Sequence, residues 1–285
     1  MIFLLIGVFI FLILFLLIVM FVDTHRLVVR KYTVYSSEVK ENTRFVMLTD
    51  LHGVAFGTKN WRLYEKIVKE QPEYILIAGD MITAHRNATF KNTLDILELL
   101  SSKYPVYYSF GNHEEKLRDR KEEFGDSLRV FLSETGAMNI HVLDNDSKYI
   151  ENKNIRIFGL SLPLEYYKKN KFMHPEREDI EKMVGKAKSR EFSVLLAHNP
   201  EYFVDYAGWG ADVVCSGHYH GGLMRLPVIG GVISPRYKLF PRYDFGEYDD
   251  RGVKMILSCG LGTHTLPIRI FNPGEISVIE IVKKT

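Results

Sequence analysis

Cysteine is scarce in this sequence, which has only two, Cys215 and Cys259, among 285 residues. Each is preceded by apolar residues and closely followed by a glycine. Two cysteines cannot form the framework of several disulfides that stabilises small secreted domains. We therefore interpret both as small buried residues, and they leave the redox compartment undecided.

An excess of one charge is also absent. The 37 Lys and Arg residues nearly balance the 35 Asp and Glu residues, the net charge is +2, and no long basic run stands out. Because nucleic-acid binding requires many phosphates to be neutralised, nucleic acid is not indicated as a partner. The residues after position 22 are enough for one large α/β domain or two small ones, and no convincing boundary divides them.

Charged residues are missing altogether from residues 1–22, which form one apolar run. A helix needs about 20 apolar residues to cross a bilayer core of ~30 Å, so this run is long enough. A secretory signal would have a basic start and a small-residue cleavage site, and neither is present. A buried core helix this uniformly apolar would be unusual, so we predict a single-pass transmembrane anchor over residues 1–22.

A few basic residues, Arg26, Arg30 and Lys31, follow the apolar run. The positive-inside rule then favours a cytoplasmic position for the rest of the chain. The bias is only a few charges, so the side of the membrane stays open.

Apolar strands that end in polar residues alternate with helices through the first half of the chain. Strands are predicted over residues 45–49, 74–78 and 106–110, with helices over 61–71 and 90–100 between them. A helix over 120–135 and an opening strand over 27–39 are predicted as well. In α/β sheets, ligands gather beyond the carboxyl ends of the strands, where the polar residues lie.

Two further predicted strands, residues 192–197 and 211–216, also end in histidines. The second leads into a glycine-rich segment that carries His218 and His220. Alternate residues of a strand point the same way, so these two imidazoles can point toward the same position. Taken alone, a turn with two incidental histidines explains the segment equally well. The polar residues at all the strand ends are Asp50, His52, Asp80, Asn112, His113, His198, His218 and His220.

Five of the ten histidines therefore lie at strand ends, which a random scatter would not produce. Mixed Asp, His and Asn ligands suit Mn²⁺, Fe²⁺ and Zn²⁺ better than Ca²⁺ or Mg²⁺, which prefer oxygen ligands. Even seven of these eight residues would be too many ligands for one such ion. That number suits two ions that share a bridging carboxylate.

The series Asp50-x-His52, Gly79-Asp80, Gly111-Asn112-His113-Glu114, His198 and Gly217-His218-x-His220 resembles the calcineurin-like metallophosphoesterase family. The motifs come in the order of that family and cover residues 45–222. The glycines after His220 and the segment 260–269 are similar to its bacterial, membrane-associated branch. That branch includes phosphodiesterases and enzymes that cleave UDP-2,3-diacylglucosamine, and some of its members are exported.

The resemblance implies an α/β fold of four layers, a β-sandwich of two sheets flanked by helices. Residues 44–285 would form this domain, and residues 23–43 would be a linker and the opening strand. The first metal would be held by Asp50, His52 and His220, and the second by Asn112, His198 and His218. Asp80 would bridge them, and His113 would stabilise or protonate the leaving group.

The implied cofactor is a pair of divalent ions, expected to be Mn²⁺ with Fe or Zn as alternatives. The implied reaction is hydrolysis of a phosphodiester or pyrophosphate bond by water activated between the two metals. The anchor makes lipid-linked substrates a candidate class beside nucleotide sugars.

Some positions depart from the family pattern and leave the substrate contacts in doubt. Met81-Ile82-Thr83 follows Asp80 where an acidic residue is common, Leu223 replaces a common Gln, and Cys259 replaces a common Arg. Arg225 and Arg269 are the candidate substrate-binding residues, because a guanidinium can bind phosphate through two hydrogen bonds. For either one alone, a surface salt bridge is the more ordinary role.

Two other functions were weighed against this one. A metallo-β-lactamase-like enzyme would need a His-x-His-x-Asp-His cluster, which the sequence lacks. A membrane-tethered sensor or non-catalytic relative of the same fold is the remaining alternative, and an activity assay separates it from an enzyme.

Overall fold

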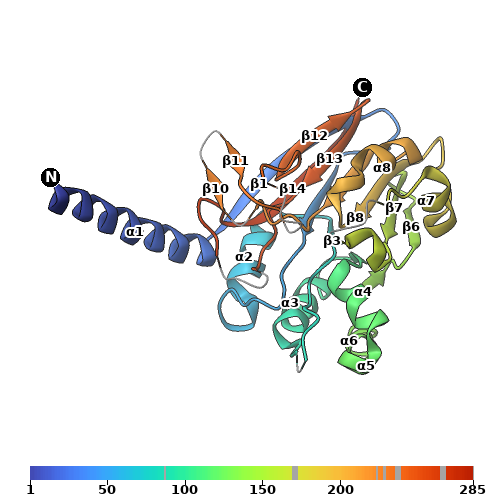
Figure 1. Cartoon of the computed structure of the whole chain (residues 1–285). Helices are drawn as coiled ribbons and strands as arrows, with labels where there is room; N and C mark the ends of the chain where they lie inside the picture. Colours follow the sequence, from blue (N-terminus) through green and yellow to red (C-terminus); the bar gives the residue numbers. More distant parts are fainter. Residues whose placement is uncertain are drawn as a thin grey trace.

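Two six-stranded sheets face each other and carry helices on their outer faces (Figure 1). The computed structural model describes residues 1–285 except residues 87, 169–172, 223, 227–228, 235–238, 264–267 and 285, so the substitution at Leu223 lies outside the described part. In spatial order, the first sheet contains β1 (Leu27–Ser36), β14 (Gly274–Lys283), β2 (Thr43–Leu48), β3 (Tyr74–Ala78), β4 (Val106–Ser109) and β5 (Ile140–Val142). The second contains β12 (Gly246–Asp250), β13 (Val253–Leu257), β9 (Val213–Ser216), β8 (Phe192–Ala197), β7 (Ile155–Leu160) and β6 (Asp146–Ile150).

The helices divide between the two sheets. Those on the side of the first sheet are α2 (Trp61–Lys69), α3 (Lys91–Ser101), α4 (Asn112–Asp119), α5 (Lys121–Phe124) and α6 (Ser127–Thr135). Those on the side of the second sheet are α7 (Arg177–Val184) and α8 (Phe203–Trp209). The folded domain also contains three single-turn helices, η1 (Thr58–Asn60), η2 (Leu164–Tyr167) and η3 (Pro200–Tyr202). A small pair of strands is formed by β10 (Arg225–Leu226) and β11 (Gly230–Gly231).

Apolar residues on both faces of the central strands produce this layering. In β2, Phe45 and Met47 point into the space between the sheets, whereas Val46 and Leu48 pack under the helices of the first sheet. Successive residues of a strand point to opposite faces, so a strand buried on both sides must be continuously apolar. A third apolar cluster lies between the second sheet and α7 and α8. The predicted four-layer sandwich is therefore confirmed.

Several element boundaries differ from the sequence-based expectation. The predicted single helix over 120–135 is two helices, α5 and α6, because Gly125 has a φ of 63° and ends the first of them. The opening strand ends at Ser36, where the Ser36 hydroxyl accepts a hydrogen bond from the Glu38 amide and starts a turn. Helix α8 and strand β12 were not expected, since neither carries a clear apolar period.

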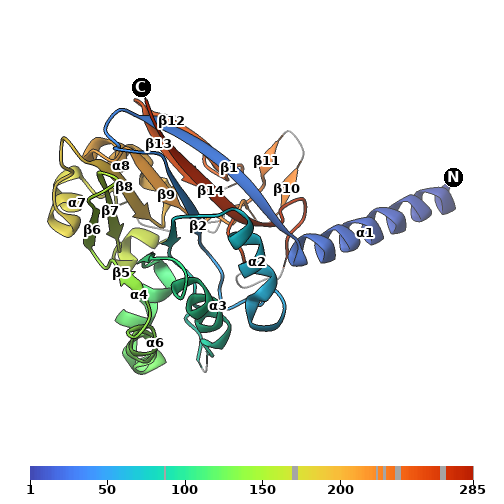
Figure 2. The same cartoon turned by 180° about the vertical axis from the view of Figure 1, so that it is seen from behind.

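The N-terminal helix α1 (Ile2–His25) projects away from the sandwich (Figures 1 and 2). Its side chains are exposed along most of its length, and its mean hydropathy reaches 3.6 over 18 residues. Among the described residues it is the one helix long and apolar enough to cross a membrane. Its last turn is tied to the body, because buried Asp23 accepts a hydrogen bond from the Asn272 amide.

The close contact between β7 and the chain after β5 predicts a sensitive position at Gly159. A Cβ atom there would overlap the carbonyl oxygen of Leu143, which is backbone and cannot rotate away. We expect Gly159→Ala to lower the free energy of unfolding by about 1–3 kcal/mol. Urea denaturation of the full-length chain in detergent micelles measures this change.

Gly208→Ala is the matched control. This glycine lies inside α8 with open space around its Cβ position, so alanine should be neutral or stabilise the protein by up to ~1 kcal/mol. Equal unfolding midpoints for Gly159→Ala and the unchanged protein would contradict the packing described here.

Candidate metal centre

The predicted polar residues meet where the carboxyl ends of strands from both sheets converge. Strands β2, β3 and β4 are parallel neighbours in the first sheet, and β8 and β9 are parallel neighbours in the second. The loops after them touch, because the Asp50 amide donates to the Gly79 carbonyl and the Gly217 amide donates to the His198 carbonyl. Residues from five strand ends thus form one cluster, as the alternating pattern predicted.

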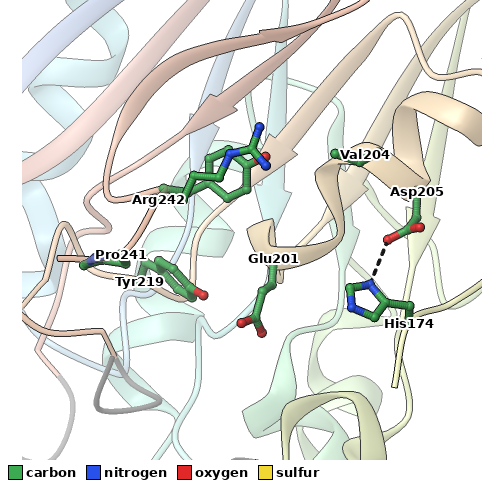
Figure 3. Close-up of a pocket in the computed structure, with 8 residues that line it drawn as sticks. His174, Glu201, Val204, Asp205, Tyr219, Pro241 and Arg242 are labelled. Carbon is green, nitrogen blue, oxygen red and sulfur yellow. Dashed lines mark hydrogen bonds and ion pairs between the residues drawn. The ribbon is translucent and has the colours of Figure 1, made fainter. Parts of the chain in front are cut away.

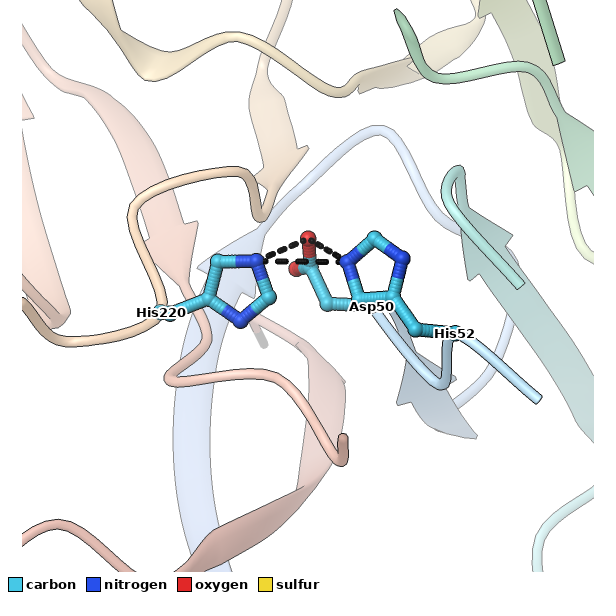
Figure 4. Close-up of side chains that lie close together, drawn as sticks. All are labelled: Asp50, His52 and His220. Carbon is cyan, nitrogen blue, oxygen red and sulfur yellow. Dashed lines mark hydrogen bonds and ion pairs between the residues drawn. The ribbon is translucent and has the colours of Figure 1, made fainter. Parts of the chain in front are cut away.

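Asp50, His52 and His220 form the first group of potential ligands (Figure 4). Both imidazoles turn a nitrogen toward the Asp50 carboxylate: Nε2 of His220 lies 3.3 Å and Nε2 of His52 lies 3.8 Å from its Oδ1. The two Nε2 atoms are 3.3 Å apart. This is the set that the family resemblance implies for the first metal.

Asp80, His198 and His218 form the second group. Nε2 of His198 lies 3.1 Å from Oδ2 of Asp80, and the same Oδ2 lies 4.0 Å from Nε2 of His52 in the first group. Asp80 therefore lies between the two groups, as a bridging carboxylate must.

Two buried atoms, one on Asn112 and one on His198 of the second group, test whether a metal fits. Oδ1 of Asn112 and Nε2 of His198 are buried, yet neither makes a hydrogen bond, although Nε2 of His198 approaches Asp80. Unpaired buried polar atoms are costly and call for an explanation. An amide oxygen and an imidazole nitrogen are ordinary ligands of a borderline divalent ion, so the residues present fit a metal here.

The charges of the second group also favour a bound cation. Burial raises the pKa of Asp80, but the neighbouring His198 and His113 outweigh it and hold that pKa well below its usual value. Burial lowers the pKa of His198, but Asp80 and Asp50 outweigh it and raise that pKa to about 9. These carboxylates thus favour positive charge at this position, and a divalent ion would supply it.

Backbone strain is concentrated in the same cluster. Five ligand candidates have positive φ angles, between 50° and 69°, which non-glycine residues rarely adopt: Asp50, His52, Asp80, His218 and His220. Each such conformation costs about 1–3 kcal/mol and persists where the surroundings enforce it, often at functional sites. In the loops after β2 and β9 these conformations occur at alternate residues, and the side chains of those residues belong to the cluster.

Glycine is required where two ligand loops approach each other. A Cβ atom on Gly111 would overlap the Asp80 carboxylate, and one on Gly217 would overlap the Asp50 carboxylate and the Thr49 hydroxyl. Neither glycine has a positive φ, so the requirement is one of space.

Hydrogen bonds from outside the cluster fix the ligand orientations. Nδ1 of His198 donates to the Ala78 carbonyl, 2.7 Å away, which leaves Nε2 facing the cluster. The Asp50 carboxylate accepts from the His218 amide and the Thr49 hydroxyl. Such second partners orient metal ligands and contribute to metal affinity.

Glu114 has a structural role that the sequence analysis did not assign. Its buried carboxylate accepts hydrogen bonds from the Tyr108 hydroxyl and from the amides of Gly111, Asp80, Met81 and Ile82. It therefore joins the loop after β3 to the loop after β4. Burial, together with the charge of Asp80, raises the pKa of Glu114 to about 7. The only available signal was its position in the Gly111–Glu114 motif.

His113 lies in a third group with His52 and Asp80, so its placement alone would also allow metal binding. The Ala84 amide donates to Nδ1 of His113 at 2.9 Å. A neutral imidazole that accepts at Nδ1 carries its proton on Nε2. That tautomer presents a proton donor rather than a lone pair at Nε2.

The two arginines proposed as substrate contacts have other partners. Nη1 of Arg225 lies 3.1 Å from Oδ2 of Asp244, and its guanidinium stacks 3.5 Å from the Phe245 ring centre. The fully buried guanidinium of Arg269 donates to carbonyl groups of Cys259, Gly260, Gly262, Asn272 and Pro273. These contacts shape the loop beside Asp50, and phosphate binding by either arginine stays a prediction.

A pocket of about 430 Å³ lies beside the loop that carries the two histidines (Figure 3). Tyr219, which stands between His218 and His220 in the sequence, lines it. Arg242, Glu201 and Asp205 line other walls, and Asp205 pairs with His174. The pocket therefore combines aromatic surface with charges of both signs.

Comparisons with known proteins agree with this geometry. The sequence profile of the calcineurin-like phosphoesterase family matches residues 43–222, more than half of the chain. The chain belongs to this family, which confirms the predicted resemblance.

Relatives are distant but extend over most of the chain. An uncharacterized metallophosphoesterase of Helicobacter pylori is 25% identical over 261 residues, 90% of this chain and 64% of that protein. The phosphodiesterase YaeI of Escherichia coli is 26% identical over 223 residues, 75% of this chain and 72% of that protein. A solved structure, the NAD nucleotidase of Haemophilus influenzae, is similar with a TM-score of 0.46 at 17% identity, covering 77% of this chain and 45% of that one.

Glu114→Gln tests whether the carboxylate between the loops supports metal binding. Glutamine keeps the shape, but its NH₂ group would face backbone N–H donors and leave some of them unpaired. We expect Mn²⁺ affinity, measured by isothermal titration calorimetry, to fall about 10–100-fold.

Glu134→Gln is the matched control, because Glu134 is exposed on α6 and lies outside the cluster. Its Mn²⁺ affinity should equal that of the unchanged protein. Unchanged affinity in Glu114→Gln as well would show that the loop connection does not support the centre.

Proposed function

We propose that this chain is a membrane-anchored, binuclear metal-dependent phosphoesterase that hydrolyses phosphodiester or pyrophosphate bonds. The observation that carries the proposal is the position of Asp80 between two ligand groups, with one carboxylate oxygen facing His198 and His52. A site for one metal ion would not need two adjoining sets of histidine ligands. Family membership supports the phosphoester class of substrate.

The proposed ligands divide as the resemblance implies. Asp50, His52 and His220 would hold one ion, Asn112, His198 and His218 the other, and Asp80 both. Divalent ions at these positions lower the pKa of water and stabilise negative charge on phosphoryl oxygens. The mixed nitrogen and oxygen ligands suit Mn²⁺, with Fe or Zn as alternatives.

His113 is proposed as the proton donor. The hydrogen bond from Ala84 to Nδ1 leaves the proton on Nε2, and Nε2 would pass this proton to the oxygen of the leaving group. The His113 amide donates to Oδ1 of Asp80, which fixes the start of α4 against the proposed bridging carboxylate. The imidazole is thereby held beside the reacting bond.

The preference for a diester or pyrophosphate rests on two supports. One is the distant relative in Escherichia coli that is named a phosphodiesterase. The other is α1, which would keep the site near lipid-linked substrates. The pocket beside Tyr219 is large enough for part of the alcohol or sugar group of such a substrate.

Hydrolysis of model substrates tests the proposal. With added Mn²⁺, we expect the full-length protein in nanodiscs to hydrolyse bis(p-nitrophenyl) phosphate, and Asp80→Ala to abolish this turnover.

His113→Asn should keep two metal ions per chain but lower kcat by about 10²–10⁴-fold. His141→Asn, on β5 against Tyr107, should behave like the unchanged protein.

Two outcomes would contradict parts of this account. Hydrolysis of p-nitrophenyl phosphate without hydrolysis of the diester would exclude the preference for diesters. Two bound metals with no turnover of any phosphoester would favour a metal-binding sensor.

The proposed orientation places the folded domain in the cytoplasm. The basic residues Arg26, Arg30 and Lys31 follow the apolar run, and Lys31 and Arg30 remain at or near the surface. A protease added to intact cells should therefore leave the domain uncut until the cells are lysed. Digestion without lysis would reverse the orientation.

A further inference from the structure

Exposed apolar side chains gather on one part of the sandwich. Eight large apolar residues outside α1 are exposed among the described residues: Tyr35, Trp61, Val130, Val204, Ile229, Leu239, Phe240 and Phe271. Four of them lie between positions 229 and 271. Their exposed fractions are 60% for Ile229, 65% for Leu239, 56% for Phe240 and 38% for Phe271. We call these four residues the apolar rim.

The apolar rim belongs to one hydrogen-bonded unit. Ile229 immediately precedes β11, which pairs with β10. Leu239 and Phe240 lie beside the residues after β11, because the Phe240 amide donates to the Val232 carbonyl and Leu239 pairs with Ile233. The Arg225 amide donates to the Ile270 carbonyl, which joins Phe271 to the same unit.

This unit lies against α1. The Phe271 ring is 6.4 Å from the Phe15 ring between centroids, and the Asn272 amide donates to the Asp23 carboxylate at the end of the helix. Figures 1 and 2 both show β10 and β11 beside the C-terminal end of α1. The apolar rim is therefore continuous with the most apolar segment of the chain.

The contact with Phe15 indicates how deep Phe271, one residue of the rim, would reach. Phe15 precedes Asp23 by eight residues, which corresponds to about 12 Å along a helix. If α1 spans a bilayer, Phe15 lies within its apolar run, and Phe271 lies beside it at the same level. Side chains at that level contact lipid rather than water, and their exposed apolar surface then becomes favourable.

We propose that the apolar rim enters the lipid bilayer beside α1 and forms a second membrane contact of the folded domain. This inference rests on the proposed membrane anchoring by α1. Arg225 and Asp244 in this unit form an ion pair, so their two charges compensate each other. Insertion of the rim therefore does not require that pair to separate.

The rim also connects the bilayer to the metal centre. Nδ2 of Asn272, next to Phe271, donates to the carbonyl groups of His220 and Gly222 at 2.6 and 2.8 Å. Insertion of the rim would hold the ligand loop at the membrane surface. The fitting substrate class is an amphiphile whose phosphate group lies at the headgroup level.

Spin-label accessibility in nanodiscs tests the proposal with the full-length chain. Cys215 and Cys259 are buried, and burial raises the pKa of both thiols, so a single added surface cysteine can be labelled selectively. Labels are placed at Ile229→Cys and Leu239→Cys on the rim. Phe9→Cys reports the middle of α1, and Val130→Cys on α6 reports an exposed apolar residue elsewhere.

Oxygen partitions into lipid, and a Ni(II) chelate stays in water. We expect the labels at positions 229, 239 and 9 to collide mainly with oxygen and the label at position 130 mainly with Ni(II). Labels at 229 and 239 that collide mainly with Ni(II), while position 9 collides with oxygen, would overturn the rim contact and leave the anchor in place. A label at position 9 that collides mainly with Ni(II) would overturn the anchor itself.

Discussion

The structure depends on two buried carboxylates whose ion-pair partners, among the residues that the structure describes, are histidines. Asp50 and Asp80 have exposed fractions of 0% and 2%, and their neighbours are histidines, whose charge depends on protonation. An isolated buried carboxylate is strongly unfavourable, so its charge must be balanced. The carboxylates raise the pKa of His198 to about 9, which favours positive charge beside them, and two divalent ions would supply more of it.

Much of the surrounding architecture follows from keeping these carboxylates in place. The strained backbone at Asp50 and Asp80, the glycines that face them, and the five-fold acceptor role of Glu114 all act on the same loops. The sandwich allows this because each sheet ends its parallel strands at the same edge. Strain that would be unstable in an isolated loop is held by two sheets at once.

The ligand set could be predicted because buried strands leave a clear trace in sequence. Residues 45–48 and 74–78 are continuously apolar, and the aspartate two residues after each run marks the carboxyl end of a strand. Arg269 shows the limit of this reasoning. Its guanidinium donates to carbonyl groups of the loop beside Asp50, and no local sequence pattern predicts these contacts. Glu114 was missed for the same reason, since its partners come from the loop after another strand. The break at Gly125 in the predicted helix 120–135 was not foreseen, because it depends on the positive φ of that glycine.

The central claim is that one cluster holds two ions that share Asp80. Electron paramagnetic resonance of the Mn²⁺-loaded protein, combined with elemental analysis of the same sample, tests it most directly. The account predicts two Mn²⁺ per chain and the spectrum of an exchange-coupled pair, which Asp80→Ala converts to that of isolated ions or removes. One Mn²⁺ per chain with the six-line spectrum of an isolated ion would contradict the binuclear centre.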